Sequence, residues 1–121
     1  MSCAVANRAP HRPHQLRRIA NRVSLGGGRK GGYECNGAGD IFVAFSTANA
    51  KAWSSDSVTA VRMVTNDRIS PLFQATVQAT EAAITNAMFA AETTIGANDL
   101  RIYAMPVDRM MAAMRKYGRI K

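Results

Sequence analysis

The stretch from residue 70 to residue 94 constrains the fold of this chain more than any other segment. Ser70 is a natural helix N-cap, Pro71 suits the first helical position, and Gly96 marks an end, so one long helix is expected. Apolar or small side chains recur along it at intervals of four and three residues. Because most of these side chains are small, this face of the helix permits close approach to a sheet or to another helix. It buries little apolar area unless such a neighbour covers it. The recurring positions are Phe73, Val77, Thr80, Ile84, Ala87 and Ala91.

Two further helices are expected on either side of that segment. Residues 13–25 place apolar side chains at helical spacing, with Pro13 in the first turn and Gly26 as a left-handed cap. Residues 107–117 predict a last helix that is capped by Gly118. The outward face of the first helix then carries Arg17, Arg18 and Arg22, and the inward face of the last carries Met110, Met111 and Met114.

The strongest strand signal lies at residues 41–46, an apolar run that suits a strand buried on both faces. Weaker signals at residues 1–9, 60–65 and 100–104 predict short strands. This mixture of helices and strands, without an internal repeat, predicts a single α+β domain over residues 1–121.

Composition narrows the class of protein. Hydrophobic residues make up 47% of the 121 residues and charged residues 20%, which predicts a packed core and excludes a wholly disordered chain. The longest unbroken apolar runs have five residues, and a membrane-spanning helix needs about 20. The first twenty residues contain arginines and no apolar stretch of signal-peptide length, so a cytoplasmic protein without a membrane partner is expected.

Positive charge is concentrated near the N-terminus. Sixteen basic and eight acidic residues give a net charge of +8, and no carboxylate precedes Glu34. Such a segment either meets something acidic or forms one face of an incomplete assembly. It could also follow the phosphates of a nucleic acid. However, no aromatic residue that could stack on bases precedes Tyr33, so a solvated face or an acidic partner chain is favoured.

Residues 26–31 match the dinucleotide-binding pattern G-x-G-x-x-G. That motif requires a strand before the first glycine and a helix after the last, whereas here a helix comes first. A helix cap that runs into a mobile loop is therefore the favoured interpretation.

The two cysteines, Cys3 and Cys35, are not in any metal-ligand spacing. Zinc sites cluster their ligands two to four residues apart, and Cys3, His11, His14 and Cys35 do not form such a set of four, so no metal site is expected. Two cysteines are also too few for a disulfide framework, and reduced thiols are expected.

Hydrolytic chemistry has one candidate nucleophile in the residues alone. No G-x-S-x-G signature is present. Removal of Met1 would expose Ser2 as an N-terminal residue whose own amine could act as the base, although an ordinary start codon followed by serine is the commoner situation.

Several segments, in order, carry a family resemblance. They are PHQLRR at residues 13–18, NGAGDIFVAFSTAN at 36–49, NDRISPLF at 66–73, ATEAAITNA at 79–87 and MRKYG at 114–118. Together they resemble the C-terminal, or β, chain of the DmpA-type serine aminopeptidases, the L-aminopeptidase/D-esterase and β-peptidyl aminopeptidase group. The similarity extends from Val5 through nearly the whole chain.

The resemblance implies a fold and a reaction. The fold is half of an αββα sandwich, as in the DmpA and ornithine acetyltransferase type, with the sheet covered by two or three helices. The enzyme arises from a precursor that cuts itself once, and the new N-terminal serine then hydrolyses N-terminal residues from peptides, amides or esters without a metal or cofactor. The partner α chain supplies further pocket groups, and αβ units assemble into homo-oligomers.

Residue by residue, the resemblance assigns a site and reveals departures. Asp40 matches the family's acidic position, where it would bind the charged amino group or organise the nucleophile. Asn36, Gly37 and Ala38 match the substrate-binding segment, but Ala38 replaces the usual serine. Counting back from residues 13–16 places the nucleophile about one residue before Met1. Ser2 would lie on the same strand face, displaced by roughly 6.6 Å at ~3.3 Å per residue, which exceeds what near-attack geometry tolerates.

These observations predict a chain that resembles the β chain of a serine aminopeptidase, is incomplete at its N-terminus and is inactive without the missing α chain. The alternative is a basic accessory or nucleic-acid-binding protein that keeps the fold and uses the surface of residues 8–30 for an acidic partner.

Overall fold

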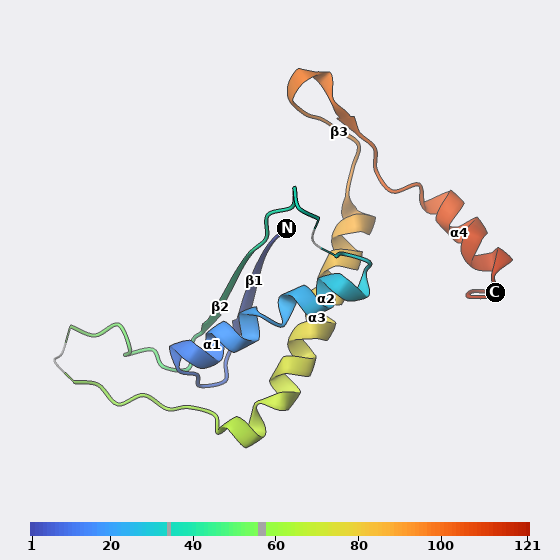
Figure 1. Cartoon of the computed structure of the whole chain (residues 1–121). Coiled ribbons are helices and arrows are strands. Elements are labelled where there is room, and N and C mark those ends of the chain that lie inside the picture. The colour runs from blue at the N-terminus through green and yellow to red at the C-terminus, as the bar shows by residue number, and fades with distance from the viewer. Residues whose placement is uncertain (34, 56–57) are drawn as a thin grey trace. The chain divides into compact units, whose positions relative to one another are not determined.

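A computed structural model describes residues 1–33, 35–55 and 58–121 (Figure 1). The chain forms two compact units, Met1–Ala82 and Ala83–Lys121. The first contains β1 (Ser2–Asn7), α1 (Pro13–Ala20), α2 (Val23–Arg29), β2 (Ile41–Ser46), the 3₁₀ turn η1 (Asn66–Arg68) and most of α3 (Ser70–Ala90). The second contains the last turns of α3, β3 (Thr94–Ile95), the turn η2 (Ala97–Asp99), β4 (Arg101–Ile102) and α4 (Val107–Lys116). The predicted α+β class is confirmed.

Strands β1 and β2 form a parallel pair that runs from Ser2 opposite Ile41 to Asn7 opposite Ser46. Parallel strands need a crossover connection, and α1 and α2 lie within it; α1 contacts both strands. The prediction of a strand at residues 41–46 is therefore confirmed, as is the weaker one near the N-terminus.

The prediction that β2 is buried on both faces is wrong for this chain. Burial alternates along the strand, and every second side chain is exposed. Ile41 is 67% exposed, Val43 54% and Phe45 48%. One face of the strand pair is thus covered by helices, and the other presents an apolar surface.

The predicted helix at residues 13–25 is two helices, because the chain turns at Asn21 and Arg22 between α1 and α2. Gly26 does not cap the first of them; it lies buried within α2. The cap is Gly31, whose φ of 87° is left-handed. The N–H of Gly32 donates to the carbonyl of Gly27 at 3.1 Å, which closes the last turn. The G-x-G-x-x-G segment is therefore mostly helix rather than a loop.

The core of the first unit lies where α1, α2 and α3 meet. Ile19, Val23, Ile69 and Val77 are its buried apolar side chains, together with Ala20. Gly26 allows α2 to approach α3, since a Cβ on it would lie 2.6 Å from Cβ of Thr80. The small face predicted for the long helix is thus used for a close helix contact.

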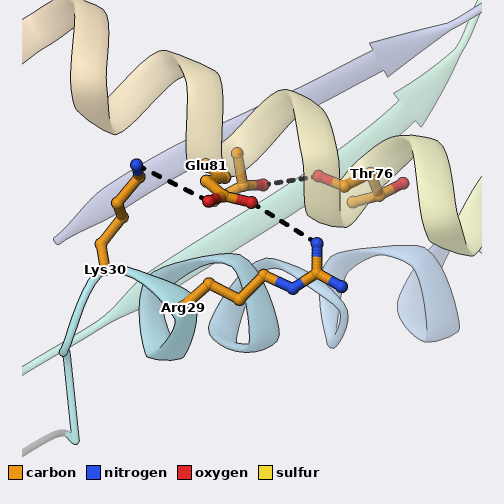
Figure 2. A network of polar contacts seen from close by, with 5 residues as sticks. Arg29, Lys30, Thr76 and Glu81 are labelled. Atoms are coloured by element: carbon orange, nitrogen blue, oxygen red, sulfur yellow. Dashed lines mark hydrogen bonds and ion pairs between the residues drawn. The ribbon is translucent and has the colours of Figure 1, made fainter. Parts of the chain in front are cut away.

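Polar groups in this contact are satisfied locally. The hydroxyl of Thr76 donates to the carbonyl of Leu72 at 2.7 Å, and that of Thr80 to the carbonyl of Thr76 at 2.8 Å. Arg29 and Lys30, at the end of α2, form ion pairs with Glu81 at 3.4 and 3.6 Å (Figure 2). The hydroxyls of Thr76 and Thr80 thus find their partners within α3 itself. For this reason threonine side chains can line the contact between α2 and α3 without a hydrogen-bond partner on α2.

No strand forms at residues 60–65, which corrects the sequence prediction. The segment is held by single contacts instead. Asn49 accepts from the N–H of Arg62 at 3.0 Å, the N–H of Val64 donates to the carbonyl of Pro10 at 2.9 Å, and Gln15 donates to the carbonyl of Val64 at 2.7 Å. The buried Gln15 side chain thus supplies a hydrogen bond that the backbone of a neighbouring strand would otherwise provide.

The second unit has short elements. The long helix ends at Ala90 rather than Thr94, and the strand predicted at residues 100–104 is limited to Arg101 and Ile102. The last helix is confirmed, with Gly118 at φ 62° as its cap. Its methionines at 110, 111 and 114 are half-buried. Among the described residues, no helix is long and apolar enough to span a membrane.

Candidate functional site at the head of the strand pair

The heads of β1 and β2 bring a chain amine and a carboxylate together. The α-ammonium of Met1 donates to Oδ1 of Asp40 at 2.5 Å and to the carbonyl of Gly39 at 3.0 Å. The N–H of Ile41 in turn donates to the carbonyl of Met1 at 3.0 Å. The side chain of Asp40 is 18% exposed, so this ion pair is partly shielded from water. The arrangement binds an ammonium group at the start of the first strand.

Ser2 is the first residue of β1 and directly follows the residue whose amine forms this ion pair. It faces Ile41 in the strand register and lies on the exposed side of β1, together with Ala4 and Ala6. A role of Ser2 as nucleophile stays a prediction.

The predicted substrate-binding residues lie on the loop that leads into β2. Asn36, Gly37 and Ala38 are exposed, and the N–H of Ala38 donates to the carbonyl of Cys35 at 2.8 Å, which makes a tight turn. The turn delivers the chain to Gly39 and Asp40. The sequence reasoning did not name the carbonyl of Gly39, since a backbone acceptor leaves no signal in the sequence.

Most of the basic side chains on α1 and α2 are engaged within the chain. The guanidinium of Arg22 lies 4.1 Å from the ring centroid of Phe73 on α3, and that of Arg18 lies 5.1 Å from it. Arg18 also donates to the side chain of Asn66 at 2.9 Å. With the ion pairs of Arg29 and Lys30 already described, these charges bind the two short helices to α3 and leave less of a free basic surface.

His11, which the sequence offered as a metal ligand or as a base for a nucleophile, is buried. It is 5% exposed, and neither ring nitrogen forms a hydrogen bond of acceptable geometry in the described structure. Burial lowers the pKa of its imidazole from the usual 6.5, and the nearby Gln15 side chain opposes this only in part. Among the described residues, no three histidine, cysteine or acidic side chains cluster as metal ligands would.

Comparisons with known proteins identify the family of this chain. The sequence pattern of Peptidase family S58 matches residues 2–102, and the chain belongs to that family. It is 46% identical over 117 residues to the β-peptidyl aminopeptidase BapA of Sphingosinicella microcystinivorans, with 96% of this chain and 30% of the relative covered. It is 34% identical to BapA of Sphingosinicella xenopeptidilytica, with 92% and 28% covered.

Solved structures give the same result for the fold. The L-aminopeptidase D-Ala-esterase/amidase of Ochrobactrum anthropi, described as a new variant of the Ntn hydrolase fold, matches with a TM-score of 0.86 at 39% identity. The PH0078 protein of Pyrococcus horikoshii OT3 matches with a TM-score of 0.88 at 42% identity. These matches cover 99% and 98% of this chain and 34% of each solved chain. The predicted family and fold class are confirmed, and the chain spans about a third of the length of its relatives.

Proposed function

We propose that this chain is part of a serine aminopeptidase that removes N-terminal residues from peptides, amides or esters. The observation that carries the proposal is the ammonium site formed by Asp40 and Gly39. It lies within about one residue of the place where the family resemblance puts the N-terminal serine and its amine. Family membership and the names of the relatives, which are β-peptidyl aminopeptidases and an aminopeptidase with esterase and amidase activity, support the same class of reaction.

The reaction proceeds through an acyl-serine. The serine hydroxyl attacks the carbonyl carbon of the substrate, and its proton passes to the serine's own amine in its neutral form. The amine then gives that proton to the leaving amine or alcohol, and an ester to the enzyme remains. Water hydrolyses that ester and restores the hydroxyl. Asp40 holds the amine so that it faces the hydroxyl, and the loop of Asn36 to Ala38 borders the substrate.

The remaining two thirds of the family's length supplies the α chain that completes the pocket, and the αβ units then form a homo-oligomer. The apolar face of the strand pair, with Ile41, Val43 and Phe45, supports this requirement because exposed patches of this kind mark interfaces.

The test combines an intact-mass measurement with hydrolysis of an amino-acid p-nitroanilide. The chain is assayed as it stands and with one serine added before Met1, where the family resemblance places the nucleophile, each alone and after co-expression with the part of the Sphingosinicella microcystinivorans relative that lies outside the matched region. Turnover is expected in the co-expressed sample, and Asp40→Asn is expected to abolish it. Asp67→Asn, the same change on the exposed η1 turn, is the matched control and should leave turnover intact.

The variant Ser2→Ala identifies the nucleophile. Ser2 is the nucleophile if two results are found together. Turnover appears only in chains that have lost the mass of Met1, and Ser2→Ala abolishes turnover both in the chain alone and in the co-expressed sample. Turnover that survives Ser2→Ala assigns the nucleophile to another serine. Absence of turnover from every sample would refute the proposed function.

A further inference from the structure

Helix α2 has little stability of its own. Three of its seven residues are consecutive glycines, Gly26 to Gly28. Glycine is the least favourable residue in a helix interior apart from proline, and an isolated helix of this length does not persist in water. The fold of α2 therefore depends on the elements that contact it, and α3 supplies the close contact at Gly26.

Glu81 on α3 adds a charged contact at the C-terminal end of α2 (Figure 2). Its Oε2 lies 3.4 Å from Nη1 of Arg29, the last residue of the helix, and its Oε1 lies 3.6 Å from Nζ of Lys30, the next residue. One carboxylate thus holds two consecutive residues, with one oxygen for each cation. The side chains of Lys30 and Glu81 are each 34% exposed, so salt screens this contact less than it screens a fully exposed pair.

Helix α2 also contacts the residue that forms the ammonium site. A Cβ built on Gly27 would lie 3.6 Å from Cε of Met1, so the side chain of Met1 lies against α2. The amine of the same residue forms the ion pair with Asp40, and its carbonyl accepts from the N–H of Ile41 at 3.0 Å. The chain that leaves α2 after residue 29 leads into the turn before Asp40. A displacement of the end of α2 therefore disturbs both members of the ion pair.

We propose that Glu81 is a positioning residue for the ammonium site at the head of the strand pair. Its ion pairs keep the glycine-rich helix folded against α3, and α2 in turn supports Met1 and the turn that precedes Asp40. Without this carboxylate the last turn of α2 opens more often, as segments of low local stability do. The inference rests on the proposed function, in which an amine at this site accepts the proton of the nucleophile.

Amide hydrogen exchange, measured by NMR on the whole chain, tests the first step. The N–H groups of Lys30 and Gly32 both donate to the carbonyl of Gly27, so their exchange reports the last turn of α2. In Glu81→Gln we expect both to exchange about three to ten times faster, which is the contribution of two partly exposed ion pairs. Glu92→Gln, the same change on an exposed residue beyond the end of α3, is the matched control and should leave both rates unchanged.

Two amides at opposite ends of the strand pair test the second step. The N–H of Ile41 donates to Met1 at the site, and the N–H of Thr47 donates to Asn7 at the far end. Positioning through α2 predicts that Glu81→Gln speeds exchange at Ile41 and leaves Thr47 unchanged. A general loss of stability would speed exchange at both amides.

The cations test whether charge carries the effect. Arg29→Gln together with Lys30→Gln removes the same ion pairs from the side of α2, and adding Glu81→Gln should then accelerate exchange at Gly32 no further, because the three side chains act as a unit. Sodium chloride at about 1 M should speed exchange at Gly32 in the unmodified chain, where it screens the ion pairs, but should add nothing in Glu81→Gln.

Turnover is measured in the co-expressed sample with the added serine. Glu81→Lys places a third positive charge beside Arg29 and Lys30, and the repulsion should lower kcat/KM at least about tenfold. Arg29→Glu and Lys30→Glu in the same chain reverse the charges and should restore kcat/KM, which a loss of packing alone would not allow. Glu92→Lys is the matched control for the added charge.

The outcomes separate this inference from the proposed function. Faster exchange at Gly32 with unchanged exchange at Ile41 overturns the inference, and so does equal acceleration at Ile41 and Thr47. Turnover that Glu81→Lys leaves intact, or that the reversed charges fail to restore, also overturns the inference but upholds the function. Absence of turnover from the unmodified co-expressed sample refutes the proposed function and, with it, a role of Glu81 in that reaction.

Discussion

Gly26 offers a direct test of how α2 packs on α3, because a single methyl group at this position has nowhere to go. A Cβ would lie 2.6 Å from Cβ and 2.8 Å from Cγ2 of Thr80, and 2.9 Å from the carbonyl oxygen of Val77. Ordinary contacts lie at 3.4–4 Å. Two of the three obstacles, a Cβ and a backbone oxygen, cannot be moved by rotating a side chain. We therefore expect Gly26→Ala to push the two helices apart.

The size of the effect follows from two opposing terms. Overpacking a well-packed contact costs about 1–3 kcal/mol, and the upper end applies where no rotamer relieves the clash. Alanine gains up to about 1 kcal/mol over glycine inside a helix. The expected net loss is about 2 kcal/mol of unfolding free energy. Gly28→Ala, in the same helix with no atom within 4 Å of the added Cβ, is the matched control and should stabilise the chain by up to about 1 kcal/mol.

Urea unfolding followed by far-UV circular dichroism measures both variants, and their slopes with denaturant must agree for the midpoints to be compared. In a Thr80→Gly background, which removes the 2.6 and 2.8 Å contacts, Gly26→Ala should be less destabilising. Thr80→Ala removes only the Cγ2 contact at 2.8 Å and retains the Cβ at 2.6 Å, so it should give less relief than Thr80→Gly. If Gly26→Ala is as stable as Gly28→Ala, the close helix contact is refuted.

Three further predictions concern the same unit. Because burial lowers the pKa of His11, the unfolded chain binds more protons than the folded chain as the pH falls below 6.5. The contribution of the neutral imidazole to the unfolding free energy should therefore be complete above pH 6.5 and decrease below it. Urea titrations at several pH values measure this dependence, and His11→Leu should flatten it. Phe73→Leu should lose about 0.5–1 kcal/mol as the guanidinium of Arg22 loses the aromatic face, and a double-mutant cycle with Arg22→Gln should show coupling; independent effects would contradict the stacking. Gly31→Ala should lose about 1–2 kcal/mol, because φ is 87° there, and an unchanged urea midpoint would argue against the left-handed cap.

Local sequence patterns predict a helix or strand correctly where one physical signal dominates the segment. The apolar run at residues 41–46 predicted β2 with its observed bounds, and Ser70 with Pro71 predicted the start of α3. Both signals are local, since β-branched or aromatic content and capping chemistry act within a few residues. The sequence reasoning failed at Gly26, because a glycine that ends a helix and one that admits a neighbouring helix look the same in the sequence. Only the position of Thr80 in space distinguishes them.

The site shows the same division. Asp40 was found through the family resemblance, whereas its pairing with the amine of Met1 depends on the parallel register that places Ile41 beside Ser2. Neither the register nor the burial of His11 has a sequence signal of its own. The segment at residues 60–65 failed for a related reason, because Gln15 and Asn49 supply the hydrogen bonds that a neighbouring strand would otherwise provide.

The disagreement over β2 is itself informative about the assembly. Its five leading residues are all apolar, a pattern that is typical of strands covered on both sides, yet the chain covers only the side of Phe42 and Ala44 with helices. The apolar side chains of Ile41, Val43 and Phe45 are exposed and gain little from burial within this chain. A second layer of structure on that face would account for the apolar pattern. This chain covers 30% of the Sphingosinicella microcystinivorans relative, so the rest of the relative's length is sufficient for such a layer. The exposed apolar face of β2 is thus the surface that fits the partner polypeptide of the proposed function.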